Sequence, residues 1–300
     1  MRIAIASGKG GAGKTTVTAS LARVWGAETP LVVADTDVEA PNLHLFLPPD
    51  LTARERVDLE VPVWDKERCT LCGACRDICR YKAIARFAST LQFFPDMCHG
   101  CGGCFAVCPA DALKRGAREL GVLEEGTVLA GSVRYLGGRT RIGEAMTPPL
   151  LRALGRRLEA MLTVCPADVL LDSPPGVSCP AMTVARDVDA VLLVADPTPF
   201  GFHDFRLAHQ AYGPQGVPVA VTVNRAGMEG NEAGDEAVRA YCRQWKLPLL
   251  AELPFERTAA EHYAAGRLAA DISPDWRRRF KSLRDGLRAF ARAGGEPCAK

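Results

Sequence analysis

Two runs of four cysteines and one glycine-rich loop are the parts of this 300-residue chain whose residue types and spacing can do chemistry. Closely spaced thiolates are ligands for zinc or for iron–sulfur clusters, and glycine-rich loops bind phosphate through backbone N–H groups. The runs are Cys69, Cys72, Cys75, Cys79 and Cys98, Cys101, Cys104, Cys108; the loop is GKGGAGKT, residues 8–15. Together they suggest that nucleotide turnover and redox chemistry are coupled in one polypeptide.

The glycine-rich loop fits the pattern GxxxxGK[ST], directly after a predicted strand and at the start of a predicted helix. In that context Lys14 contacts the β- and γ-phosphates and the Thr15 hydroxyl binds Mg²⁺. The alternative is a glycine turn without a ligand. The predicted nucleotide-binding residues of this segment are Gly8, Lys9, Gly10, Gly11, Ala12, Gly13, Lys14, Thr15 and Thr16.

Both cysteine runs have the spacing CxxCxxCxxxC, and Pro109 follows the second run. This spacing resembles that of two-cluster bacterial ferredoxins, although Arg80 follows the first run where proline is common. Paired zinc sites are the alternative. His99 lies inside the second run, and we expect it to be solvated or capping because thiolates already fill every ligand position. The resemblance implies crossed ligation: Cys69, Cys72, Cys75 and Cys108 bind one [4Fe–4S] cluster, and Cys98, Cys101, Cys104 and Cys79 bind the other.

The segment KGGAGKTT, with its additional Lys9, resembles the deviant phosphate loop of the MinD, ParA, Mrp and nitrogenase iron protein class. In that class the first lysine reaches the nucleotide of a partner subunit, which implies an ATP-dependent homodimer. Asp172, in the segment DSPPG, resembles the Walker B aspartate that acts on Mg²⁺, and Gly176 would offer its N–H to the γ-phosphate. Asp35 lies in the matching switch I region.

The same resemblance gives roles to two further residues, and together they complete the predicted site. Asp37 would orient the attacking water, so the predicted catalytic residues are Lys9, Lys14 and Asp37. Asn224 would bind adenine. For both Asp37 and Asn224 a capping role is the alternative. The segment PTPFGFHD, residues 197–204, also matches the family of MinD-like P-loop ATPases that carry an inserted ferredoxin domain.

Outside the cysteine runs, short β-branched segments alternate with longer segments of helical periodicity. This alternation predicts an α/β fold with a doubly wound, mostly parallel sheet. The expected ATPase domain comprises residues 1–60 and 114–300, with a small α+β ferredoxin-like domain inserted at 61–113 and a short hairpin near 121–135. The predicted strands are 2–7, 31–35, 168–172, 190–196, 217–224 and 249–253, and the predicted helices are 14–25, 150–161, 202–211, 234–245 and 256–265.

Composition sets limits on localisation and partners. A charged share of 24% and a net charge of +2 are ordinary for a soluble protein and favour no nucleic-acid partner. Without a signal peptide or an apolar run of about 18 residues, we expect a cytoplasmic protein. In the C-terminal segment Trp276, Phe280, Leu283, Leu287 and Phe290 share one helical face, which we expect to dock on the sheet; contact with an anionic membrane is the alternative.

Four further cysteines lack ligand spacing among themselves: Cys165, Cys179, Cys242 and Cys298. Cys179 lies where the nitrogenase iron protein has a cysteine that bridges a cluster, but no matching upstream partner is found. A carrier of the Mrp type would need a late CxxC pair, which the sequence lacks.

These features predict a weak ATPase with ATP, Mg²⁺ and two [4Fe–4S] clusters as cofactors. We expect closure of a homodimer to control electron transfer with an unidentified redox partner. One alternative is an assembly factor that carries iron–sulfur clusters to a client protein. The other is a spatial-positioning ATPase acting on membrane or DNA.

Overall fold

A nine-stranded, mostly parallel sheet forms the body of the protein in this computed structural model, which describes residues 1–294. The strand order is β11-β10-β9-β1-β8-β2-β7-β6-β3, and the seven strands from β11 to β7 run parallel. The predicted strands are present as β1 (Arg2–Ala6), β2 (Leu31–Asp35), β8 (Asp168–Asp172), β9 (Ala190–Ala195), β10 (Val219–Ala226) and β11 (Leu249–Pro254). The predicted α/β class is confirmed.

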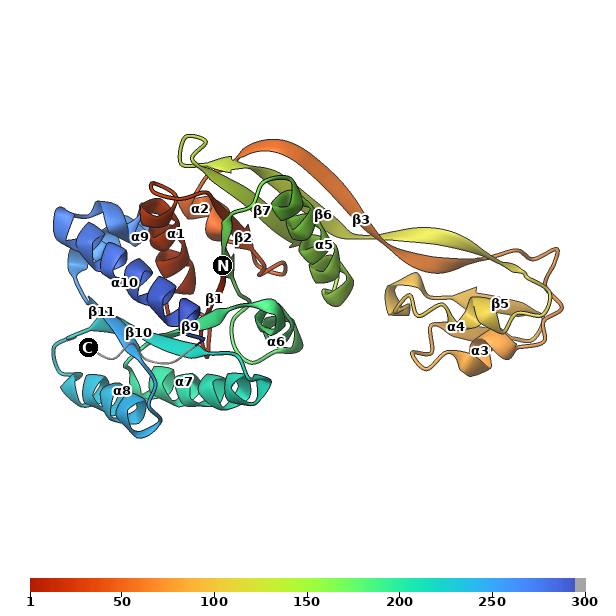
Figure 1. Ribbon diagram of the computed structural model, residues 1–300. Coiled ribbons are helices and arrows are strands. Elements are labelled where there is room, and N and C mark those ends of the chain that lie inside the picture. Colours follow the sequence, from red (N-terminus) through yellow and green to blue (C-terminus); the bar gives the residue numbers. More distant parts are fainter. Residues whose placement is uncertain (295–300) are drawn as a thin grey trace.

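Alternation along the strands divides the core into two layers, because successive side chains of a strand point to opposite faces. Ile3 and Ile5 of β1 belong to the layer under α1 (Lys14–Trp25) and α10 (Pro274–Arg292). Ala4 and Ala6 belong to the opposite layer, under α5 (Pro148–Val164), α7 (Pro199–Tyr212) and α8 (Glu232–Gln244). Both faces are therefore covered, as Figure 1 shows.

Helix α10 packs on the sheet as predicted, and its five apolar residues, Trp276, Phe280, Leu283, Leu287 and Phe290, are all buried in the core. The Ser273 hydroxyl caps its first turn by accepting a hydrogen bond from Trp276 N–H. The apolar stripe is therefore already used inside the protein. No helix within residues 1–294 is long and apolar enough to cross a membrane.

A long antiparallel strand pair, which we call the arm, was not predicted from the sequence. It consists of β3 (Asp50–Trp64) and β6 (Leu113–Val128), paired from Asp50 opposite Thr127 to Trp64 opposite Leu113. The predicted hairpin at 121–135 is longer than expected, since β6 pairs with β7 (Val133–Thr140) as far as Thr140. Residues 50–56 are all exposed, so β3 lacks the buried alternation by which a strand is recognised.

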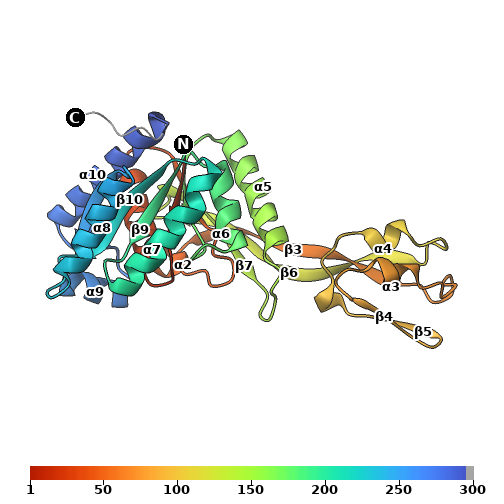
Figure 2. The ribbon, with the colours of Figure 1, turned by 90° about the horizontal axis from the view of Figure 1, so that it is seen from below.

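A small unit at the far end of the arm contains both cysteine runs (Figure 1). It comprises α3 (Ala74–Ile78), β4 (Ile84–Phe87), β5 (Thr90–Phe93), η1 (Pro95–Met97) and α4 (Gly103–Ala106). Figure 2 shows from a second direction that this unit projects away from the sheet. We call it the cysteine unit. The remaining short helices, α2 (Leu43–Phe46), α6 (Cys179–Val184), α9 (Arg257–Ala264) and the 3-10 turns η2 to η4, belong to the body.

Candidate functional site: a phosphate loop and two thiol-lined cavities

The phosphate loop joins β1 to α1, and three of its four glycines, Gly8, Gly11 and Gly13, are required where they stand. Gly11 and Gly13 have φ of 82° and 95°, a region that favours glycine. A Cβ on Gly8 would lie 2.1 Å from Asp204 O, so no larger residue fits there. Helix α1 begins with no side-chain cap and no acidic residue in its first turn. Its unpaired N–H groups and positive dipole end therefore face the loop, an arrangement suited to an anion.

Asp172 at the end of β8 is the polar centre of the site. The Thr15 hydroxyl lies 2.7 Å from Asp172 Oδ2, and the Thr18 hydroxyl donates to Oδ1 at 2.9 Å. Burial raises the pKa of Asp172, while Lys14 and the two hydroxyls oppose that rise. Thr18 is a functional residue that sequence reasoning missed. Its only signal was its position one helical turn after Lys14.

Asp35 and Asp37 follow β2 on the adjacent strand. Asp35 is fully buried and accepts hydrogen bonds from Asn42 N–H and Leu43 N–H at 3.1 and 3.0 Å. Burial, and then repulsion by Asp172, raises the pKa of Asp35 well above its ordinary value. Burial raises the pKa of Asp37 to about 6, although the nearby Lys14 ammonium opposes this. The site thus gathers three carboxyl groups around one lysine.

The cavity beside the loop has a volume of about 410 Å³, within the range of small-molecule sites. Lys14, Thr15, Thr16, Asp37 and Asn224 line it. Asn224 Nδ2 donates to Ala12 O at 2.9 Å, which holds the loop against the end of β10. Gly10, Gly11 and Gly13, which were also predicted, complete the loop's share of the lining, whereas sequence reasoning missed Asn42, Arg225, Phe255 and Tyr263.

Lys9 and Gly176 make contacts within this chain. Lys9 Nζ lies 3.9 Å from Asp196 Oδ2, and the side chain is about one-third exposed. Gly176 has φ of 76°, and its N–H donates to Ser7 O at 3.0 Å. That N–H would therefore have to leave Ser7 before it could donate to a phosphate.

Comparison with known proteins identifies the family. Residues 3–269 match the description CobQ/CobB/MinD/ParA nucleotide binding domain. The chain belongs to this family. The uncharacterized protein MJ0578 of Methanocaldococcus jannaschii is 32% identical over 235 residues, 76% of this chain and 79% of that protein. MJ0579 of the same archaeon is 25% identical over 252 residues, 81% of this chain and 90% of that protein.

Solved structures share the fold of this family. The septum site-determining protein MinD complexed with Mg-ADP, from Pyrococcus horikoshii, has a TM-score of 0.58 at 20% identity and covers 98% of each chain. A chain of the MinC:MinD cell division protein complex of Aquifex aeolicus has a TM-score of 0.59 at 16% identity, covering 96% of each. At these identities the likeness concerns the fold alone.

This member of the nucleotide-binding family also carries two cavities lined by thiols, four cysteines to each. One is lined by Cys69, Cys72, Cys75 and Cys108, which we call the distal quartet. The other is lined by Cys79, Cys98, Cys101 and Cys104, the proximal quartet. Each quartet takes three cysteines from one sequence run and one from the other. Within residues 1–294 no group of three or more His, Cys, Asp or Glu is arranged to hold a metal ion.

The two cysteine runs have matching backbones, 29 residues apart. Leu71 and Gly100 have φ of 55° and 63°, and Gly73 and Gly102 have φ of 85° and 75°. Lys82 and Asp111 match in the same way, with φ of 55° and 48°. Left-handed residues other than glycine are uncommon, so these matches show that the unit is built from two equivalent halves.

Backbone N–H groups point at four of the sulfurs, again in matching pairs. Leu71 N–H and Gly100 N–H donate to Cys69 and Cys98 Sγ, each at 3.4 Å. Ala83 N–H and Ala112 N–H donate to Cys79 and Cys108 Sγ at 3.3 and 3.2 Å. Burial is the main cause that raises the pKa of Cys75, and it raises that of Cys104 to about 11.

The quartets lie at different distances from the body. Glu60 and Pro62 line the proximal cavity, whereas Ala112 and Leu113, at the tip of the arm, line the distal one. Cys98 also packs against Leu59, Val61, Leu120 and Met146, next to the body. The proximal quartet is therefore the one through which the cysteine unit contacts the arm around Leu59, Val61 and Leu120, a part that we call the base of the arm.

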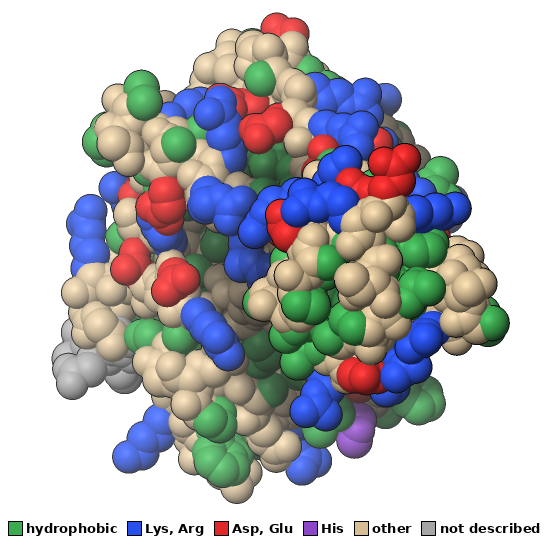
Figure 3. Space-filling view, turned by 90° about the vertical axis from the view of Figure 1, so that its right-hand side faces the viewer, with side chains coloured by type: hydrophobic (Ala, Val, Ile, Leu, Met, Phe, Trp, Pro, Cys, Tyr) green, Lys and Arg blue, Asp and Glu red, His purple; other side chains and the backbone are tan. Residues whose placement is uncertain are grey.

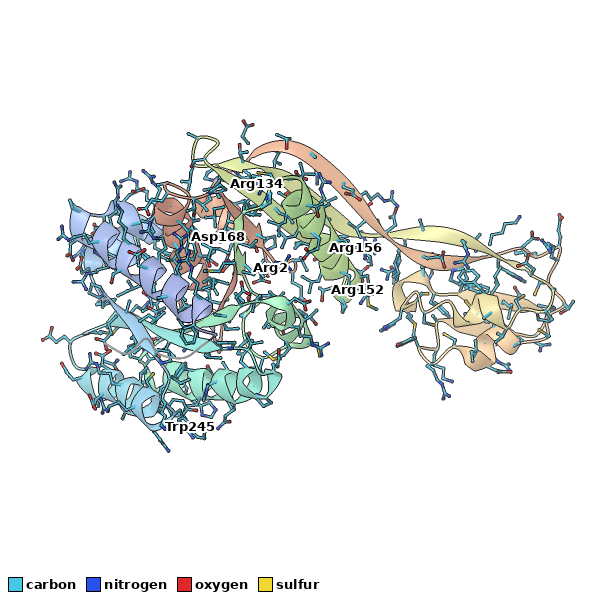
Figure 4. The ribbon with its side chains drawn as sticks, viewed as in Figure 1. Arg2, Arg134, Arg152, Arg156, Asp168 and Trp245 are labelled. Carbon is cyan, nitrogen blue, oxygen red and sulfur yellow. The ribbon has the colours of Figure 1, made fainter. Side chains whose placement is uncertain are left out.

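Of the remaining predicted residues, His99 lines the proximal cavity, whereas Cys165, Cys179 and Cys242 line none of the three cavities. Cys165 and Cys179 are exposed, Cys242 is buried, and Cys298 lies outside the described residues. His99 stacks on Tyr81 with ring centroids 3.5 Å apart, a contact that the sequence did not predict. At the amino-terminal ends of the strands, away from the phosphate loop, Arg134 donates to Met161 O, and Asp168 pairs with the chain's amino group (Figure 4). These contacts stabilise the packing at the amino-terminal ends of β7 and β8.

Proposed function

We propose that this chain is an ATP-binding, slowly ATP-hydrolysing iron–sulfur protein. Closure of a nucleotide-bound homodimer would control electron transfer between two [4Fe–4S] clusters and a redox partner. When bound, each cluster would supply storage for one electron. Nucleotide binding, ATP hydrolysis and dimer closure would depend on the chain's own residues.

The observation that carries the proposal is the crossed sorting of eight cysteines into two all-thiol quartets around two cavities. A donor set of four thiolates suits a [4Fe–4S] cluster. The four N–H···S contacts also support it, since hydrogen bonds to the sulfurs tune such clusters. Within residues 1–294 these thiols are not arranged to hold a single metal ion, which favours a multi-atom cluster over one zinc ion.

At the nucleotide, Lys14 would hold the β- and γ-phosphates, while Thr15 and Asp172 would act on Mg²⁺. A divalent cation would also relieve the repulsion between the buried carboxylates of Asp35 and Asp172. Asp37 would orient the attacking water. Within residues 1–294 the Lys9 ammonium is held by one 3.9 Å contact to Asp196, and it would leave this contact to reach the nucleotide of a second copy.

A continuous set of contacts joins the nucleotide site to the proximal quartet. Val38, next to Asp37, accepts a hydrogen bond from Thr140 N–H at 2.8 Å, and Arg141 N–H donates to Leu120 O at 2.8 Å. The buried side chains of Arg118 and Glu144 pair below the cysteine unit. Arg118 also donates to Cys98 O at 3.4 Å. A movement of the segment that contains Asp37 would therefore change the position of Cys98.

Reoxidation of the reduced protein tests this proposal. Purified anaerobically, the chain should contain iron and acid-labile sulfide, and its reoxidation rate should differ between ATP and ADP. Lys14→Ala should remove that difference, whereas Lys281→Ala, a surface variant on α10, should keep it. Identical rates with ATP, with ADP and in Lys14→Ala would contradict the gating role.

A cluster-assembly factor is the second candidate function, and the exposure of Cys72 and Cys101 favours it. One exposed ligand in each quartet would give an acceptor protein access to the cluster. ATP-dependent transfer of an intact cluster to an apo-ferredoxin would support this function. Stable retention of both clusters in the presence of ATP and acceptor would argue against it.

A further inference from the structure

The outer face of the proximal quartet is apolar, although it is exposed. Ile78, Tyr81 and Phe94 line the proximal cavity together with the exposed thiol of Cys101. These three side chains are 44%, 43% and 38% exposed, respectively. Figure 3 looks along the arm from its tip and shows hydrophobic side chains gathered there, with Lys and Arg at their margin. A contiguous exposed apolar surface marks an interaction site.

Basic side chains beside this face are not neutralised within the protein. Within residues 65–115 four cations form ion pairs: Arg68 with Asp111, Arg76 with Asp77, Lys114 with Asp65 and Arg115 with Glu60. Lys66 and Arg86 form none with the residues that the structure describes, and neither lines the proximal cavity. Arg80 and Lys82, on either side of Tyr81, have no carboxylate oxygen within 4.0 Å anywhere in residues 1–294. Both are exposed. Residues 65–115 as a whole contain eight Lys and Arg against five Asp and Glu.

We propose that this face, formed by Ile78, Tyr81 and Phe94 with Arg80 and Lys82 at its edge, docks an acidic electron-transfer protein. The inference rests on the proposed function, since it names the partner of the proximal quartet. Interfaces between redox proteins are small, and charge complementarity sets their association rate more than their area does. An apolar centre around an exposed ligand and a basic edge fit a partner that surrounds its cofactor with carboxylates.

The first test measures electron transfer from the dithionite-reduced chain to the oxidised flavin of an acidic flavodoxin used as probe, one electron in each encounter. The variant Arg80→Glu/Lys82→Glu should lower the second-order rate constant at least 10-fold at low salt, and high salt should lower the wild-type rate. The control Arg278→Glu/Arg292→Glu makes the same charge change on α10, far from the cysteine unit, and should change the rate less than 2-fold. Equal rates in the two double variants would overturn the proposal.

Arg80 and Lys82 could also act on a bound cluster, by offsetting its charge, instead of on the partner. An uncharged quinone oxidant distinguishes these two roles. Docking predicts that the quinone oxidises Arg80→Glu/Lys82→Glu at the wild-type rate. An equal loss with quinone and with flavodoxin would overturn docking, because it would show that the cations act on the cluster and not on the partner.

The second test does not depend on the redox activity of the chain. Zero-length carbodiimide coupling should join the Lys82 amine to a carboxylate of the flavodoxin, as mapped by mass spectrometry. Coupling only at lysines outside the cysteine unit would overturn the proposal. A preparation that lacks iron and sulfide would contradict the proposed function, while the position of the coupling would still decide where the acidic protein binds.

Discussion

The carboxyl group of Asp37 is partly buried beside Lys14, and its pKa is raised to about 6. An aspartate whose pKa is higher in the folded state binds its proton more tightly there, so the free energy of unfolding falls as pH rises from about 3.8 to about 6. We therefore expect Asp37→Asn to stabilise the nucleotide-free protein at pH 8 by on the order of 1 kcal/mol, after allowing for partial exposure.

Urea unfolding of this variant at pH 5 and pH 8 checks the prediction. The stabilisation should shrink at the lower pH, because Asp37 is then largely protonated in the folded state. Glu229→Gln, at an exposed position outside the cavity, is the matched control, and its effect on stability should not differ in this way between the two pH values. A stabilisation that is equal at both pH values would show that Asp37 is not the titrating group.

Thr18 is the second residue whose role follows from the structure. Its hydroxyl donates to the carboxylate of Asp172, which is only 1% exposed to solvent. Thr18→Val keeps the side-chain shape and removes the donor, so it should cost about 1–3 kcal/mol of unfolding free energy. Thr163→Val, at an exposed helical position, should cost less than about 0.5 kcal/mol in the same urea experiment. Equal losses would contradict the role given to Thr18.

At the scale of elements, the sequence predicted what is buried and missed what is exposed. Strands such as β2 and β8 are continuous apolar runs, and α1 and α10 have clear apolar faces, so periodicity located them within a few residues. Strand β3 has seven exposed residues at its start, and its stability comes from pairing with β6. A cross-strand partner is not visible in local periodicity.

The same distinction applies to the sites. The phosphate loop is one local segment, so its motif predicted its position between β1 and α1. Asn42 and Phe255 reach the site from other elements, Thr18 lies one helical turn into α1, and no motif marks any of the three. For the cysteines, the resemblance to ferredoxins implied crossed ligation, which stays a prediction, while each of the two cavities is lined by cysteines of both runs.

We expect a change at the nucleotide site to reach the proximal quartet through the base of the arm. The variant Arg118→Met/Glu144→Met replaces a buried ion pair by apolar side chains of similar size, an exchange that is often neutral for stability. It should keep both clusters and nucleotide binding, yet bring the ratio of the ATP and ADP reoxidation rates close to one. Arg56→Met/Glu119→Met removes an exposed pair between β3 and β6 and should leave the ratio unchanged. A wild-type ratio in the first variant would place the coupling elsewhere.

At the scale of the whole molecule, each quartet combines cysteines from both halves of the cysteine unit. Clusters bound in this crossed way would join the two halves, and two double variants test the crossed ligation. Cys69→Ser/Cys108→Ser removes two ligands from one crossed quartet, whereas Cys98→Ser/Cys108→Ser removes one ligand from each. Crossed ligation predicts that the first variant keeps one cluster, about four irons per chain, and that the second keeps none. Ligation within each sequence run predicts the reverse. Iron and acid-labile sulfide assays on anaerobically purified protein separate the two arrangements. Iron retained only by Cys98→Ser/Cys108→Ser would overturn the crossed pairing and, with it, the order of distal and proximal quartets along the arm.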